Sequence, residues 1–337
     1  MKRSAPDRVR LIDVAAAAEV TKSIASRVLN GDPTVAVRPE TRRRILQVAR
    51  DLGYQPHAGA RALANSRTMA LALIAPSTDN PPYITIARGA YRRAGEHGYL
   101  ALLAEDFEEQ PAGRSLVDGG RVDGLLMGSA VPGHPLVAHL DRTSFPHVFV
   151  NRAVPGSNRN ITMNVGRAGE LAVEHLTGLG HRRIAHLAGP AEVEQSSDRL
   201  AALDRAIRDR GLPVIPPLFG DFTEATGFAC APALLAARPT AVFTSSPGQA
   251  IGVIRHLSDA GVRVPEEISV IAYGDFPSAG FTVPSITTIA LPLLELGAAA
   301  VDELVAQLDG EPPRDLVIPD APRLHPRQST GPAPAAD

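Results

Sequence analysis

Five polar residues open a short helical pattern near the N-terminus: Thr21, Lys22, Ser23, Ser26 and Arg27. Threonine is a good N-cap, and ammonium, guanidinium and hydroxyl groups can donate hydrogen bonds to base edges and phosphates when such a helix enters the major groove of DNA. An ordinary helical hairpin with a solvated polar face has the same spacing. The side chains alone therefore leave both interpretations open.

Three short helical patterns would position these side chains. The first has apolar residues at helical spacing from Leu11 to Ala18, and the second follows Thr21. The third begins at Pro39, a residue suited to a first helical turn, and Gly53 stops it. Two helices joined by a tight turn and packed by a third predict a small helix-turn-helix head.

The charges are divided unevenly along the chain. The 337 residues include 34 Lys and Arg against 36 Asp and Glu, a net charge of -2. Residues 1–67 carry 13 basic and 6 acidic residues, a net charge of +7, so the other 270 residues carry -9. A basic head on an acidic body favours nucleic-acid contact by the head alone.

From Met69 onward, continuous apolar runs alternate with amphipathic helical patterns. The runs are ALALIAP, YLALLAE, VDGLLMG, PHVFVN, RIAHLAG, TAVFTSS and ISVIAYG. Apolar runs that are bounded by turn residues and separated by helices predict parallel sheets with right-handed crossovers. The expected fold class is therefore a small all-α helix-turn-helix head plus an α/β body of two parallel-sheet lobes.

The composition limits the compartment and the chemistry. Cys230 is the single cysteine and is expected to be a small buried hydrophobe, so an intramolecular disulfide is excluded. Asp13 and Glu19 interrupt the apolar stretch that a signal peptide would need, and no run approaches the ~18 apolar residues of a membrane span. His181 fits a structural role better than metal ligation. Motifs of nucleotide-binding, zinc-dependent and nucleophile-elbow enzymes are absent, so we expect no enzyme, no cofactor and no membrane partner.

A series of different short motifs follows in a fixed order from residue 11 to residue 330. Those of the head are Asp13-Val14-Ala15, Ser26-Arg27-Val28-Leu29-Asn30, Leu52-Gly53-Tyr54-Gln55-Pro56 and Ala60-Arg61-Ala62-Leu63. Those of the body include Gly98-Tyr99, Val122-Asp123-Gly124, Leu179-Gly180-His181, Val264-Pro265, Thr287-Thr288 and Arg327-Gln328-Ser329. In this order they resemble the lactose-repressor (LacI/GalR) family of bacterial transcription regulators.

The resemblance implies a set of DNA contacts in the head. Lys22 and Ser23 match the positions that read bases most directly, and Arg27 matches a third; a phosphate contact is the alternative for Lys22. Four further residues match positions that grip the DNA backbone or pack the head: Thr21, Ser26, Asn30 and Tyr54. Ala60 and Leu63 match a hinge helix whose paired leucines wedge into the minor groove of a pseudo-palindromic operator. Outside this motif, a leucine such as Leu63 would more often belong to a core.

Two residues of the head depart from the family pattern. Glu19 stands in the turn where glycine is frequent, and a left-handed non-glycine residue costs ~1 kcal/mol, so the turn is expected to differ slightly. Gly59 weakens the hinge helix by about 1 kcal/mol relative to alanine. We therefore expect the hinge to fold only on DNA.

The resemblance also implies a body like that of periplasmic sugar-binding proteins, with a small effector between the lobes. Ligands of α/β sheets lie beyond the carboxyl ends of the strands. The candidates there are Asn80, Tyr83, Ser129, Asn151, Arg152, Arg199, Phe222, Ser246 and Asp275. Arg199 matches the family arginine that holds an effector hydroxyl or carboxylate, with a solvated surface arginine as the alternative.

Several of these positions have lost an acidic residue. Ser246-Pro247 replaces the usual Asn-Asp, Gly274-Asp275 replaces Asp-Asp, and Asn164 stands where aspartate is frequent. Fewer carboxylates would bind fewer sugar hydroxyls. The effector is therefore expected to be less hydroxylated or anionic, with a sugar, a sugar phosphate or a carboxylate as the candidates.

These observations predict four segments along the chain. They are a helix-turn-helix DNA-binding domain (1–55), a hinge helix and linker (56–68), a two-lobed effector-binding and dimerisation domain (69–330) and a disordered tail (331–337). The predicted function is a sequence-specific transcriptional regulator, a homodimeric repressor that acts on double-stranded DNA in the bacterial cytoplasm at the nucleoid. A solute-binding protein or an enzyme on the same body is the alternative. The dimer face is expected around Ile84 to Tyr91.

Overall fold

A computed structural model describes residues 9–29, 32, 34–54, 67–77, 81–106, 112–131, 133–191 and 194–335. The chain divides into two compact units. One comprises Met1–Ala70 with Gly119–Asp123, and the other comprises Leu71–Asp118 with Gly124–Asp337. Each is described on its own below.

The head contains the three expected helices, α1 (Leu11–Ala17), α2 (Lys22–Leu29) and α3 (Pro39–Asp51). The Arg10 N–H donates to the Asp13 carboxylate (2.8 Å) at the start of α1. The Thr21 hydroxyl accepts a hydrogen bond from the Ile24 N–H (3.3 Å) and so caps α2. A small apolar core joins the helices and is built on Ala15, Ala18, Ala25, Val28, Val35 and Ile45.

The turn between α1 and α2 keeps a left-handed residue. Glu19 has φ 50°, and its N–H donates to the Ala16 carbonyl (3.1 Å) while the Val20 N–H donates to the Ala15 carbonyl (3.0 Å). The turn therefore does not avoid the positive φ at Glu19. The neighbouring hydrogen bonds and helix packing hold that residue in a conformation that costs about 1 kcal/mol.

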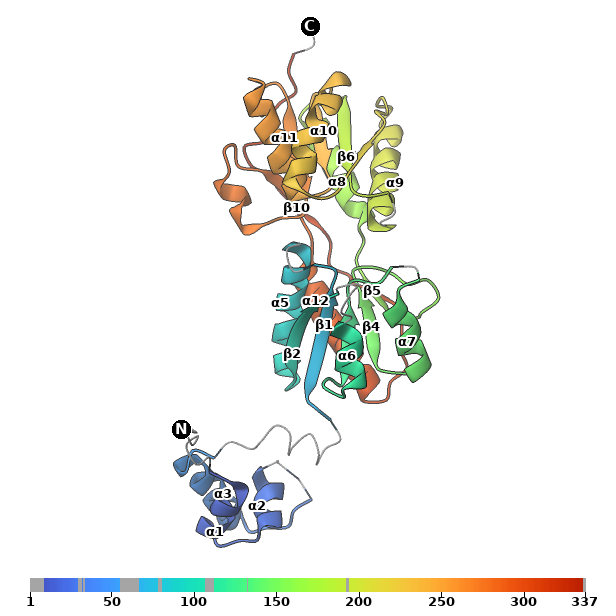
Figure 1. The fold of residues 1–337 in the computed structure, drawn as a ribbon. Coiled ribbons are helices and arrows are strands. Elements are labelled where there is room, and N and C mark those ends of the chain that lie inside the picture. Colours follow the sequence, from blue (N-terminus) through green and yellow to red (C-terminus); the bar gives the residue numbers. More distant parts are fainter. Residues whose placement is uncertain are drawn as a thin grey trace, which may run out of the picture. The chain divides into compact units, whose positions relative to one another are not determined.

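The first lobe of the body is a six-stranded sheet in the order β11-β5-β4-β3-β1-β2 (Figure 1). Its strands are β1 (Ala70–Ala75), β2 (Leu100–Glu105), β3 (Gly124–Met127), β4 (His147–Val150), β5 (Asn160–Thr162) and β11 (Leu316–Val317). Its helices are α5 (Pro81–Glu96), α6 (Ala112–Asp118), α7 (Pro135–Thr143) and α12 (Leu293–Leu308). The registered pairs are parallel, as in β1–β3 with Leu71 opposite Gly124.

The second lobe is a six-stranded sheet in the order β12-β10-β9-β8-β6-β7. Its strands are β6 (Ile184–Ala188), β7 (Leu218–Phe219), β8 (Ala241–Thr244), β9 (Ser269–Tyr273), β10 (Thr287–Ala290) and β12 (Arg323–His325). Its helices are α8 (Gly166–Gly178), α9 (Glu194–Asp209), α10 (Glu224–Ala236), α11 (Pro247–Asp259) and the short η1 (Pro277–Phe281). β12 runs antiparallel to β10, and the other registered pairs are parallel. The α/β body of two parallel-sheet lobes is confirmed.

The chain passes between the lobes three times. It leaves the first sheet after β5, returns after β10 to form α12, and leaves again between β11 and β12 (Figure 1). α12 packs against α5 although some two hundred residues separate them in sequence. The first lobe is thus completed by a late segment of the chain.

The C-terminal segment is tied to the second lobe. The Gly331 N–H donates to the Ser269 hydroxyl (3.0 Å), and the Ala333 N–H donates to the Leu179 carbonyl (2.8 Å). His181, 1% exposed, has its Nε2 3.0 Å from the Gly331 carbonyl oxygen. The expectation of disorder from residue 331 is therefore wrong for Gly331 and Ala333, because buried polar groups of the lobe bind this backbone; residues 336–337 lie outside the described residues. Within the described residues, no helix is long and apolar enough to span a bilayer.

Candidate functional site

The polar residues of α2 lie on one exposed side of the head. Lys22 and Ser23 are exposed in the first turn, and Ser26 and Arg27 follow them by four residues. Residues four apart on a helix lie on the same face. Ala25 and Val28 are buried instead, so α2 packs through its apolar side and presents the predicted DNA-contacting side chains outward.

Arg27 is held by the loop that follows α2. Its Nε donates to Asp32 Oδ2 (2.7 Å) and its Nη2 donates to Thr34 Oγ1 (2.8 Å). Hydrogen bonds from the Thr34 hydroxyl and the Arg27 guanidinium lower the pKa of Asp32 to about 2. Nothing in the sequence pattern singled out Asp32 or Thr34, because this contact depends on how the loop after α2 folds back.

The other predicted DNA contacts are described only in part. Tyr54 is half-buried at the end of α3, where its N–H donates to the Ala49 carbonyl (2.8 Å). Asn30, Ala60 and Leu63 lie outside the described residues, as do Gly59 and most of the expected hinge, residues 56–68.

A cavity of about 520 Å³ in the body receives residues from both lobes. Six of the nine predicted effector-binding residues line it: Tyr83, Asn151, Arg152, Arg199, Phe222 and Ser246. Asn151 and Arg152 directly follow β4, and Ser246 follows β8, so the carboxyl ends of strands do supply the lining. Asn80 lies outside the described residues.

Arg199 lies against two aromatic rings. Its guanidinium carbon is 4.0 Å from the centroid of the Tyr273 ring and 5.9 Å from that of Phe222, and the residue is 4% exposed. Cation–π attraction is strengthened by such desolvation. Tyr273 ends β9 and was interpreted from the sequence only as part of an apolar run. The structure thus excludes the solvated surface arginine as the alternative for Arg199.

A chain of hydrogen bonds positions Asn151. Its Nδ2 donates to the Tyr83 hydroxyl (3.4 Å), which donates to the Gly128 carbonyl (3.0 Å). Asn151 has φ 71°, a left-handed conformation that asparagine tolerates better than most residues. The neighbouring Arg152 has a buried Nε that makes no hydrogen bond to any described residue.

Ser246 and Gln249 connect three loops beside the cavity. The Ser246 hydroxyl donates to the Phe222 carbonyl (2.7 Å) and accepts from the Gln249 N–H (3.0 Å), so it caps α11. The fully buried amide of Gln249 accepts from the Ser245 N–H (2.9 Å) and donates to the Asp221 carbonyl (2.8 Å). Sequence reasoning missed Gln249, because a glutamine in the first turn of a helix is usually solvated.

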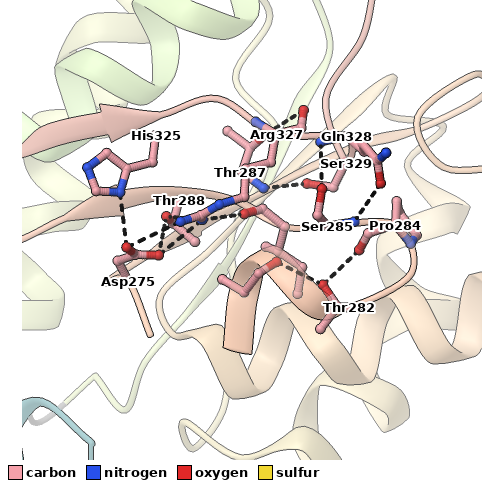
Figure 2. Close-up of polar contacts among 12 residues, drawn as sticks. Asp275, Thr282, Pro284, Ser285, Thr287, Thr288, His325, Arg327, Gln328 and Ser329 are labelled. Atoms are coloured by element: carbon pink, nitrogen blue, oxygen red, sulfur yellow. Dashed lines mark hydrogen bonds and ion pairs between the residues drawn. The ribbon is translucent and has the colours of Figure 1, made fainter. Parts of the chain in front are cut away.

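Asp275 does not line the cavity, contrary to expectation, although Gly274 and Phe276 on either side of it do. Its carboxylate accepts hydrogen bonds from Thr288 Oγ1 (2.7 Å) and Arg327 Nη1 (3.0 Å), and His325 Nδ1 lies 3.0 Å from its Oδ2 (Figure 2). Burial acts to raise the pKa of Asp275, but the hydrogen bonds outweigh it and hold that pKa below its ordinary value. Asp275 therefore fastens the loop after β9 to β10 and to the segment after β12.

Ser129 is also placed differently from expectation, outside the lining of the cavity. Its hydroxyl donates to the Asp106 carboxylate, whose Oδ2 lies 3.0 Å from His134 Nε2. The carboxylate thus lies between the hydroxyl and the imidazole. A serine nucleophile needs the imidazole at its hydroxyl, so this trio does not have the order of a catalytic triad.

Comparisons with known proteins agree with both parts of the chain. Residues 10–57 match the profile of bacterial regulatory proteins of the lacI family, and residues 173–330 match that of the periplasmic binding protein-like domain. The chain is 30% identical over 332 residues to catabolite control protein A of Priestia megaterium, covering 96% of this chain and 99% of that protein. It is 33% identical over 305 residues to the ribose operon repressor of Escherichia coli K12, covering 88% and 92%.

A solved structure extends the likeness to three dimensions. The Lac repressor dimer bound to operator and the anti-inducer ONPF superposes with a TM-score of 0.81 at 25% identity, over 96% of this chain and 100% of that chain. The ribose operon repressor and the Lac repressor are repressors of nearly the same length as this chain, and they confirm the resemblance found in the motifs. The chain therefore belongs to the LacI family of bacterial DNA-binding transcription regulators.

Proposed function

We propose that this regulator is a homodimeric repressor whose affinity for a pseudo-palindromic operator changes when a small effector binds in the body. The observation that carries the proposal is the exposed face of α2, where Lys22, Ser23 and Arg27 stand on a head with a net charge of +7. A helix of this kind places its N-terminal side chains against base edges in the major groove. Lys22 and Ser23 would read bases, and the Arg27 guanidinium would leave Asp32 to join them.

The effector would act through the cavity. Because residues of both lobes line it, a ligand there can favour one arrangement of the lobes over another. A ligand that distinguishes two arrangements alters DNA affinity, and DNA alters ligand affinity by the same factor.

An exposed apolar face of the first lobe supports the dimer. Ile84, Tyr91, Leu100 and Leu103 are 38–64% exposed on α5 and β2, and β2 is the edge strand of its sheet. Exposed apolar surface on an unpaired edge favours association with another chain. Two chains related by a twofold axis would match the two half-sites of a pseudo-palindrome.

The proposal places the protein in the bacterial cytoplasm with its DNA and includes no catalytic step. The relatives named above are regulators, and the Ser129 trio does not have the order of a nucleophilic site. The alternative of an enzyme or a solute-binding protein thus gains no support from the described residues.

The test is fluorescence anisotropy of the full chain with a labelled duplex from upstream of its own gene, against a scrambled duplex. We expect two chains per duplex, and Lys22→Ala should weaken specific binding by about 5- to 150-fold. Arg255→Ala, on the exposed side of α11, is the matched control and should bind like the parent protein. Equal affinity for both duplexes would refute the proposal.

A second measurement reads Lys22 directly. The sequence contains two lysines, Lys2 and Lys22. Chemical acetylation followed by mass spectrometry should modify Lys22 in the free protein and leave it protected on the upstream duplex. Modification that is unchanged by the duplex would exclude Lys22 from the DNA interface.

A further inference from the structure

The hydroxyl groups beside the cavity already have internal partners. Tyr83 donates to the Gly128 carbonyl, Ser246 donates to the Phe222 carbonyl, and Thr223 donates to Asp221 Oδ1 (2.6 Å). The Ser245 hydroxyl is 3.0 Å from His186 Nε2. The Tyr83, Ser246 and Thr223 hydroxyls each give their one hydrogen to the protein and keep only lone pairs, so the donors for an anionic ligand must come from other lining residues.

Carboxylates are scarce in this lining. Glu224 is the one carboxylate among the described lining residues, and it lies exposed in the first turn of α10. A helix N-terminus itself favours a negative charge there. The described part of the cavity therefore offers one exposed carboxylate, and no buried one, as a charged acceptor for the hydroxyl groups of a polyol.

Positive charge is present instead. Arg152 and Arg199 both line the cavity, and the Arg152 Nε is a buried donor without a hydrogen-bond acceptor among the described residues. His186 near Arg199 is neutral, because burial and the positive charge of Arg199 lower its pKa to about 3. The two guanidinium groups therefore carry the positive charge. A buried donor beside a second guanidinium favours an acceptor that carries a full negative charge.

The remaining walls are apolar. They are formed by Pro81, Pro82, Met163, Phe222, Pro247, Ile251, Phe276, Leu291 and Leu293. These side chains gain from burying hydrocarbon or an aromatic ring and offer nothing to a hydroxyl group.

We propose that the cavity binds an organic anion with an apolar body, a carboxylate or a phosphate ester, which Arg152 and Arg199 recognise by charge. The apolar body would pack against Phe222 and Phe276. The inference rests on the proposed function in taking this cavity as the effector site, but ligand binding can be measured without DNA.

Isothermal titration calorimetry of the full chain without DNA tests the charge requirement with matched ligand pairs. The pairs are phenylacetate with 2-phenylethanol, phenyl phosphate with phenol, and ribose 5-phosphate with ribose. We expect the anionic member to bind at least about tenfold more tightly than its neutral partner in one or more pairs. The phenylacetate and phenyl phosphate arms distinguish a carboxylate from a phosphate ester.

Variants then locate the anion. Arg152→Gln and Arg199→Gln should each weaken the binding anion by about tenfold or more, whereas Arg255→Gln on the exposed side of α11 should not. Because Arg199 is buried, circular dichroism should first show that its variant is folded, and the half-buried Arg152 gives an independent result.

Three results would overturn the inference: tighter binding of the neutral members, no binding of any anion, or anion binding that both arginine variants leave unchanged. Operator binding without anion binding would overturn this inference alone. Anion binding without operator binding would refute the proposed function and leave the inference standing.

Discussion

The pKa of the buried His186 imidazole depends in part on the positive charge of Arg199, which lines the cavity. His186 lies on β6, 3% exposed, with its ring 5.2 Å from that of Phe243. Burial lowers its pKa to about 3, with a further contribution from the positive charge of Arg199. Between pH 6.5 and about 3, an unfolded chain would protonate this imidazole, whereas the folded protein keeps it neutral.

This shift predicts a pH-dependent stability with a definite sign. The pKa of His186 is 6.5 in its ordinary state and about 3 in the fold. Between these values the unfolded chain binds more protons, so the free energy of unfolding should fall as pH is lowered below 6.5, by at most about 1.4 kcal/mol per pH unit. Above pH 6.5 the imidazole is neutral in both states, so His186 no longer makes the free energy of unfolding depend on pH. Urea unfolding on either side of this pH measures the slope.

His186→Gln provides the comparison, because glutamine can bond to the Ser245 hydroxyl but does not titrate. The variant should be less stable above pH 6.5 and should lose part of the slope below it. His147, His175 and His181, whose pKa values are also lowered by burial, remain in both proteins. Identical slopes in the two proteins would contradict the assignment to His186.

The sequence predicts single residues unequally. Asn151, Arg152 and Ser246 could be found because they directly follow apolar runs, and strand ends in α/β sheets face ligands. Asp275 follows a run as well, yet Arg327 and Thr288 bind its carboxylate from segments that a local pattern does not connect (Figure 2). Long-range hydrogen bonds of this kind decide whether a polar side chain is free for a ligand.

At the scale of elements, the packing of α5 on α12 depends on two glycines. A Cβ atom on Gly89 would overlap the carbonyl oxygen of Leu294, and one on Gly297 would overlap that of Ile86. The sequence predicts both helices from their periodicity. It does not predict their pairing, because α12 is reached only after the chain has built most of the second lobe (Figure 1).

Gly89→Ala should therefore destabilise the first lobe. The obstacle is backbone rather than a flexible side chain, so the helices must separate, at an expected cost of about 1–3 kcal/mol or more. Gly95→Ala is the control on the same helix, since nothing lies within 4 Å of the added methyl group and alanine favours helix by about 0.5–1 kcal/mol. In thermal unfolding, the transition temperature of Gly89→Ala should be lower than that of the parent protein, and that of Gly95→Ala should be equal or higher. Equal transitions for the two variants would show that the interface is loose.

At the scale of the whole molecule, the net charge of -2 is the sum of a head at +7 and a body at -9. Phosphate attracts the first and repels the second at distances within about a Debye length, ~10 Å at moderate salt. Salt should therefore weaken DNA binding through counterions released by the head. The acidic body would confine the DNA contact to the head without any direct interaction.

The salt dependence of binding tests whether the head alone contacts the DNA. The logarithm of the association constant should fall linearly with the logarithm of salt concentration, and each neutralised phosphate contributes a slope of about -0.9. Lys22→Gln should make the slope shallower by up to about that amount, because the charge is exposed at the start of α2. Arg263→Gln removes a charge of the same sign from an exposed site on the body, where Arg263 pairs with Glu267, and should leave the slope unchanged. If Arg263→Gln made the slope shallower to the same degree, the body itself would contact the DNA, and the charge division along the chain would no longer explain where the operator binds.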